Sequence, residues 1–129
     1  MSTNGATGTD TSHPLNPLSA EEISQTTTIL RGSGRITPMM RIMAYSPHEP
    51  DKRTVLAWAP GQPVRRSVDV VIRDHERRLT IEALVSLPEG EVTLWRERGD
   101  VQPALTYPEV FAAMQAAYDD SAFQQALAK

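Results

Sequence analysis

Three runs of alternating apolar and polar residues, joined by short turns, constrain the fold of this sequence most strongly. The runs span Val64–Arg73, Leu79–Leu87 and Val92–Glu97. In the middle run the apolar residues fall at every second position, on one side of an extended strand: Leu79, Ile81, Ala83, Val85 and Leu87. The polar stretches between the runs are short enough for hairpin turns. The pattern predicts an antiparallel meander with one buried face.

Two further runs precede the meander. Arg35–Tyr45 is rich in apolar residues but contains Pro38, which predicts an edge strand or a strand with an irregular start. After a loop at residues 46–52, Thr54–Ala59 predicts a short strand that is ended by the turn residues 60–63.

Two helix starts are encoded by capping boxes. Ser19 followed by Glu22, and Thr106 followed by Glu109, have the spacing in which both residues satisfy backbone N–H groups of the first helical turn. The first helix should end at the glycines of Gly32–Gly34. The second start leads into apolar residues at helical spacing, and the helical pattern resumes after a break at 119–121: Phe111, Met114, Tyr118, Phe123 and Leu127.

These elements predict an α+β fold, with one helix packed on a four-stranded antiparallel sheet and a helical segment after it. Residues 1–12 contain almost nothing apolar and are expected to form a disordered lead. Residues 13–100 should form the α+β domain. Residues 101–129 should form a linker and helices that begin a further, incomplete domain, because their apolar face lacks enough chain to cover it.

The composition excludes several function classes. With 129 residues, a net charge of −3, 40% hydrophobic and 22% charged residues, the chain is typical of a folded soluble domain. The absence of cysteine excludes disulfides, thiolate metal sites and cysteine nucleophiles. No apolar run reaches the length of a membrane span, and no secretory signal is visible. We therefore expect a cytoplasmic protein with neither a membrane nor a nucleic acid as its partner.

The residues that could carry chemistry are scattered. His13, His48 and His75 are far apart in the sequence and each lies beside a turn or a proline, which favours loop histidines over a metal site. The strand and turn carboxylates lie at outward positions near arginines, which favours a solvated face over an acid–base pair: Asp69, Glu82, Glu91 and Glu97. No serine lies in a G-x-S-x-G elbow, and Gly32-Ser33-Gly34 fits a helix end better than a phosphate loop.

Basic and large apolar side chains also have structural interpretations. One hairpin is flanked by basic residues without interleaved aromatics, which favours strand-edge protection or an acidic partner over nucleic acid: Arg65, Arg66, Arg73, Arg77 and Arg78. Core or interface positions are expected for the remaining large side chains, namely Trp58, Trp95, Met39, Met40 and Met43. We therefore predict no catalytic, cofactor-binding or metal-binding residue in this chain.

Several strings together resemble the copper-containing amine oxidases (primary-amine oxidases). The segment His13–Ile23, HPLNPLSAEEI, is similar to the family's HPLDPLSAEEI opening. Three further stretches resemble the strands of that family's second N-terminal domain: Arg65–Arg73, Glu82–Leu87 and Gly90–Trp95. The stretch from Val101 to Lys129 is similar to the start of its third N-terminal domain. Asn16, where the family usually has aspartate, and Pro38 depart from the pattern.

The resemblance implies a cystatin-like, non-catalytic domain. It also implies a full enzyme that uses copper and topaquinone to oxidise primary amines to aldehydes, with release of ammonia and hydrogen peroxide, as a homodimer. This sequence has neither an H-x-H pair nor an Asn-Tyr pair, so none of the family's reactive residues is present here. The implied partners are the remaining amine-oxidase domains or a second polypeptide that carries them.

Two other functions stay open. The chain could be a stand-alone cystatin-like module that binds another protein through its sheet, with the last helices folded back onto it. A small enzyme on the same α+β shell is a third interpretation.

Overall fold

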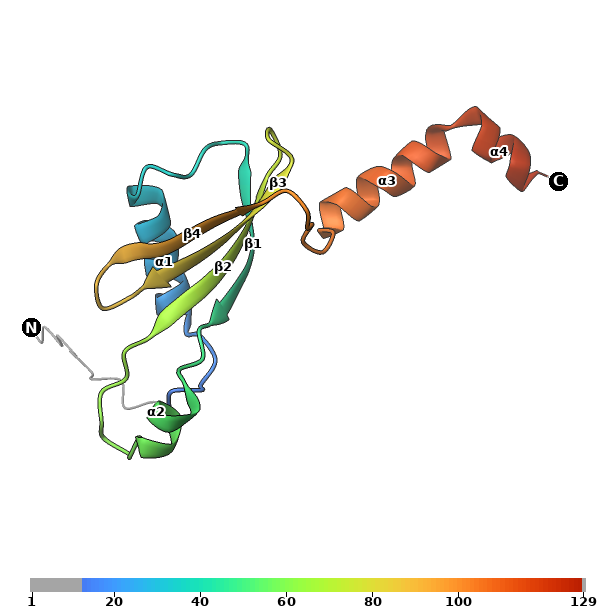
Figure 1. The fold of residues 1–129 in the computed structure, drawn as a ribbon. Helices are drawn as coiled ribbons and strands as arrows, with labels where there is room; N and C mark the ends of the chain where they lie inside the picture. Colours follow the sequence, from blue (N-terminus) through green and yellow to red (C-terminus); the bar gives the residue numbers. More distant parts are fainter. Residues whose placement is uncertain (1–12, 129) are drawn as a thin grey trace, which may run out of the picture.

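The computed structural model describes residues 13–128, so the predicted disordered lead at 1–12 lies outside the described residues. The elements follow in the order α1 (Ala20–Gly32), β1 (Met40–Pro47), α2 (Lys52–Ala57), β2 (Ser67–Asp74), β3 (Leu79–Ser86), β4 (Glu91–Arg98), α3 (Tyr107–Asp119) and α4 (Ser121–Leu127) (Figure 1).

The four strands form one antiparallel sheet in the order β1-β2-β3-β4. The register pairs Val70 with Ala83 and Ile72 with Ile81, so the alternating apolar residues of β2 and β3 share one face. The α+β fold with a four-stranded meander is therefore confirmed, and a cystatin-like description is consistent with it.

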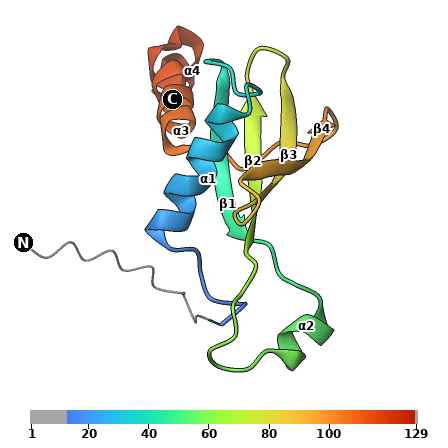
Figure 2. The ribbon, with the colours of Figure 1, turned by 90° about the vertical axis from the view of Figure 1, so that its left-hand side faces the viewer.

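Helix α1 lies on this apolar face (Figure 2). The buried core consists of Leu30 from α1 and residues of the two central strands: Val68, Val70, Ile72, Ile81, Ala83 and Val85. Burial of such aliphatic side chains contributes about 1.5–3 kcal/mol each. Thr27 and Tyr45 add a hydrogen bond of 2.7 Å between α1 and β1. The helix and the sheet thus form one packed body.

The capping box of α1 is confirmed. The Ser19 Oγ accepts from the Glu22 N–H at 3.1 Å, and Glu22 Oε2 accepts from the Ser19 N–H at 2.8 Å. The helix ends at Gly32, and Gly34 follows with φ +72°. Gly32-Ser33-Gly34 is therefore a helix end, as predicted.

The prediction of a strand at Thr54–Ala59 is wrong. Residues Lys52–Ala57 form the short helix α2, in which Asp51 Oδ1 accepts from the Thr54 N–H at 2.8 Å. This cap satisfies a backbone donor that a lone short strand would leave without a partner. Helix α2 lies in the connection from β1 to β2, beyond the end of the sheet (Figure 1).

Strand β1 also starts later than predicted. It begins at Met40 and not at Arg35, since Pro38 offers no backbone donor for the ladder. The register with β2 shifts between Ile42 and Ala44, so Met43 is an extra residue on the edge strand. The irregular edge strand is confirmed.

Helices α3 and α4 extend away from the sheet as an arm, defined here as residues 107–127 (Figure 1). The second capping box is present, with Thr106 N–H donating to Glu109 Oε2 at 2.7 Å. Neither helix contains a buried residue. Within residues 13–128, no helix is long and apolar enough to cross a membrane.

Candidate functional site

The three histidines occupy separate surroundings. The His13 ring packs edge-on against Trp58 with ring centres 4.9 Å apart. His48 Nδ1 lies 2.8 Å from Asp69 Oδ2, beside the start of β2. His75 follows the far end of β2, roughly 20 Å away from His48 at about 3.3 Å per strand residue.

This arrangement does not fit a copper centre. Copper bound by imidazole needs several ring nitrogens that converge on one point. Within residues 13–128, no group of three or more histidine, aspartate or glutamate side chains is placed to hold a metal ion. The donor set of the described part of the chain therefore offers copper no convergent site.

The strand carboxylates that could have formed an acid–base pair instead face cations. Glu97 Oε1 accepts from Arg77 Nη2 at 2.9 Å, and this guanidinium lowers the pKa of the Glu97 carboxyl. Glu82 Oε2 lies 3.7 Å from a terminal nitrogen of both Arg96 and Arg98. These contacts place arginines beside both carboxylates, and no second carboxyl group lies beside either of them in the contacts described, as an acid–base pair would require.

The most buried carboxylate is Asp74, which the sequence pattern treated as part of a polar turn. Its residue is 2% exposed. The side chain accepts from the backbone N–H groups of Glu76 and Arg77 at 3.0 Å each, and from Arg77 Nε at 2.8 Å. The donation from the Arg77 backbone is the main reason why the pKa of Asp74 is lowered. Asp74 organises the β2–β3 turn, in which Arg78 has φ +56°.

Arg66 is engaged inside the domain and does not protect an exposed edge. Its Nε donates to Glu22 Oε1 at 2.7 Å, and both side chains are largely buried. Its terminal nitrogens donate to the carbonyls of Pro14 and Pro17 at 3.1 and 3.2 Å. This guanidinium joins the N-terminal segment and α1 to the start of β2. Its neighbour Arg65 is exposed and pairs with Glu89 at 2.6 Å.

The large apolar side chains divide between core and surface. Trp95 and Met40 pack against the core, and the Arg35 guanidinium lies 5.4 Å from the centre of the Trp95 ring. Met39 is 50% exposed in the turn before β1, so it does not belong to the core, and an interface position for it stays a prediction.

A shallow depression of about 340 Å³ lies where the arm leaves the sheet. Its lining includes Met39 and Arg41 from the β1 side, His75, and Glu109 from α3. The pKa of Glu109 is lowered mainly by hydrogen bonds from Thr106, with smaller contributions from the charges of His75 and Arg41. The depression has no nucleophile beside a base, so it forms a joint between body and arm rather than a reaction site.

Comparison with known proteins identifies the family of this chain, which the geometry of the described residues does not. Residues 19–94 match the family described as the AGAO-like N2 domain. The chain is 43% identical over 86 residues to a primary amine oxidase of Klebsiella aerogenes, covering 64% of this chain and 11% of that protein. It is 32% identical over 119 residues to a primary amine oxidase and to a copper methylamine oxidase of Arthrobacter sp. (strain P1), covering 92% of this chain and 18% of each relative.

The chain therefore spans less than a fifth of the length of these relatives. The family match covers α1, the four-stranded sheet down to Leu94, and the capping box at Ser19. The chain belongs to the AGAO-like N2 domain family, whose members are N-terminal domains of the copper-containing primary-amine oxidases.

Proposed function

We propose that this chain is a non-catalytic N-terminal part of a copper- and topaquinone-dependent primary-amine oxidase, or a separate subunit that supplies this part. The full enzyme would convert primary amines to aldehydes with release of ammonia and hydrogen peroxide. The match of residues 19–94 to an N-terminal domain of that family carries the proposal. The separation of His48 from His75 supports a role outside the reactive centre.

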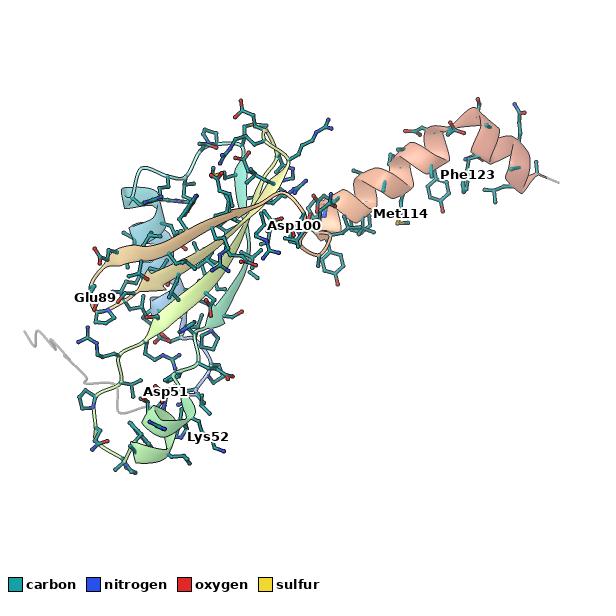
Figure 3. The ribbon with its side chains drawn as sticks, viewed as in Figure 1. Asp51, Lys52, Glu89, Asp100, Met114 and Phe123 are labelled. Atoms are coloured by element: carbon teal, nitrogen blue, oxygen red, sulfur yellow. The ribbon has the colours of Figure 1, made fainter. Side chains whose placement is uncertain are left out.

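We further propose that residues 13–100 and 101–129 belong to two structural units. The family match ends at residue 94, before the arm begins. The arm exposes large apolar side chains along both helices: Tyr107, Phe111, Met114, Tyr118, Phe123 and Leu127. Figure 3 shows Met114 and Phe123 on the arm, clear of the sheet. Helices this short are marginal in water without tertiary packing, so the arm is expected to pack with further chain, such as the third N-terminal domain of a dimeric enzyme.

The experiment measures copper content and amine-dependent peroxide release. The purified chain should hold no stoichiometric copper and release no peroxide from a primary amine. If the chain is a separate subunit, it should associate with an amine-oxidase polypeptide that lacks this domain when the two are mixed. Stoichiometric copper together with peroxide release from the chain alone would reject the proposal.

A stand-alone cystatin-like binding module is the alternative, favoured by the complete α1–sheet body within residues 13–98. In that case the arm should fold back onto the sheet in solution. Hydrogen exchange distinguishes the two functions, because a folded-back arm would be protected from exchange and an arm that lacks its packing partner would not.

A further inference from the structure

The stretch of chain that connects the sheet to the arm is fixed at both of its ends. Before the connection, the buried Thr80 donates its hydroxyl to the carbonyl of Val101 at 2.8 Å, which holds this residue against β3. After the connection, the capping box of Thr106 and Glu109 fixes the first turn of α3. Residues 102–105 therefore lie between two fixed points (Figure 1).

The segment 102–105 is itself loosely packed. Within the described residues 13–128, no hydrogen bond joins this segment to the sheet or to α3. The segment lines a cavity of about 100 Å³ together with Arg73, whose buried Nη1 has no hydrogen-bond partner among the described residues. Because neither hydrogen bonds nor tight packing restrict its backbone dihedrals, the segment has the features of a hinge.

The first turns of α3 meet the body at the depression of about 340 Å³. Pro108, Glu109 and Ala112 line its arm side, and the body side includes Arg41 and His75. No residue of α3 is buried, so apolar packing contributes little to the orientation of the helix.

Opposite charges lie across this depression. The carboxylate of Glu109 is near the guanidinium of Arg41, and His75 adds a second positive charge when it is protonated. Both groups act on Glu109 through space, since the hydrogen bonds to its carboxylate come from Thr106. This attraction is strongest while α3 lies against the body, so it favours that orientation over all others.

We propose that the joint is a latched hinge. The arm pivots at residues 102–105, and the attraction of Glu109 to Arg41 and His75 holds the arm in the orientation seen in Figure 1. Since α3 is about 20 Å long, a small rotation at the hinge moves its far end by many ångströms. The joint thus sets the direction of any chain that follows the arm. The inference rests on contacts within this chain and does not depend on the proposed function.

The test measures the distance between a spin label on α1 and one on α3 in the 129-residue chain, by double electron–electron resonance. The sequence has no cysteine, so Ser24→Cys and Ala116→Cys, both at exposed positions, place the two labels without background. The labelled chain should show one dominant, narrow distance. High salt should reduce the population of this distance, because salt screens exposed charges.

Glu109→Gln separates the latch from the helix cap. Glutamine can also close a capping box, so α3 still begins after Thr106, but the charge near Arg41 is removed. The dominant distance should lose about two- to fivefold of its population relative to other distances, as expected for an exposed charge interaction. Asp119→Asn removes a carboxylate from the far end of α3 and should leave the distance unchanged.

Arg41→Gln tests the other side of the latch. It should lower the population of the dominant distance by no more than Glu109→Gln does, because His75 remains. The double variant should be no broader than Glu109→Gln alone, since the two charges act on each other.

Thr80→Val tests the fixed point before the hinge. Valine has nearly the shape of threonine but lacks the hydroxyl that binds the Val101 carbonyl, so the hinge lengthens toward β4 and the distance distribution should broaden. Thr80→Ser keeps the donor and should give the wild-type distribution. Thr93→Val removes a hydroxyl that bonds within the sheet, to the carbonyl of Leu84, and is the matched control.

Each outcome decides for or against the latched hinge. A wild-type distribution as broad as that of Glu109→Gln would overturn the latch, and so would equal broadening by Asp119→Asn. Equal widths in the wild type and in Thr80→Val would overturn the bounds of the hinge. Circular dichroism of the labelled chain checks that the arm is helical, and a chain without the helical signal of α3 would overturn the whole proposal.

Discussion

Helices α1 and α3 are each 13 residues long and each begins with a capping box, yet only one of them has a core to pack on. Helix α1 buries Thr26 and Leu30 against the sheet, whereas α3 buries none of its residues. The comparison separates two physical contributions: local hydrogen bonds decide where a helix starts, and burial decides whether the helix belongs to the cooperative fold.

The largest expected difference between the two regions comes from deletion of an apolar side chain. Ile72→Ala should lower the free energy of unfolding by about 4 kcal/mol, because Ile72 is fully buried. Phe111→Ala removes a larger side chain from the arm and should leave the unfolding midpoint of the body unchanged. Urea unfolding followed by the combined fluorescence of Trp58 and Trp95 measures both. A comparable loss in Phe111→Ala would mean that the arm packs on the body.

The next largest effect is expected at the buried ion pair. Arg66→Ala should cost about 3 kcal/mol of unfolding free energy, because Glu22 and two proline carbonyls lose their donor. The adjacent Arg65→Ala, which removes an exposed pair with Glu89, is the control and should leave stability unchanged within error. Similar losses in the two variants would contradict a specific role for Arg66.

Asp74 should make the body sensitive to acid. Its pKa is lowered in the folded state, so its contribution to stability is complete above about pH 4 and is lost as the pH falls through the folded value. Asp74→Asn should cost about 2 kcal/mol at pH 7 through its weaker hydrogen bonds. The free energy of unfolding of the Asp74→Asn variant should also change less between pH 5 and pH 2 than that of the wild type, as measured by urea unfolding. An unchanged pH profile would contradict this assignment.

The smallest expected effect compares the two capping boxes directly. Ser19→Ala should lower the free energy of unfolding of the body by about 1 kcal/mol. Thr106→Ala removes the equivalent hydroxyl from α3 and should reduce only the helical circular dichroism signal, with the unfolding midpoint unchanged. Equal shifts of the midpoint in the two variants would place α3 in the same cooperative unit as α1.

Features set by neighbouring residues could be predicted from the sequence. The alternation in residues 79–87 predicted which face of β3 is buried, and both capping boxes form as expected. Helix α2 could not be predicted this way, because six residues are too few for a helical period. Thr54 and Val55 favour strands, and only Asp51 three residues before Thr54 indicated a cap.

Features that depend on distant partners could not be predicted. Arg66 meets carbonyls 49 and 52 residues away, and no local pattern indicates such a contact. Asp74 belongs to a turn whose composition is ordinary, so its burial depends on the way the sheet closes over it. The sequence spacing of the histidines was enough to predict that they lie apart. In the structure His48 and His75 lie beside opposite ends of the eight-residue strand β2.

The prolines of the N-terminal segment have a practical consequence. The Arg66 guanidinium donates to the carbonyls of Pro14 and Pro17, so the residues before α1 are bound to the segment that leads into β2. A shortened gene product that began at Ala20 would keep the Arg66–Glu22 pair but lose both proline carbonyls and the Ser19 cap of α1. Excision of this unit for grafting onto another scaffold therefore has to begin no later than Pro14.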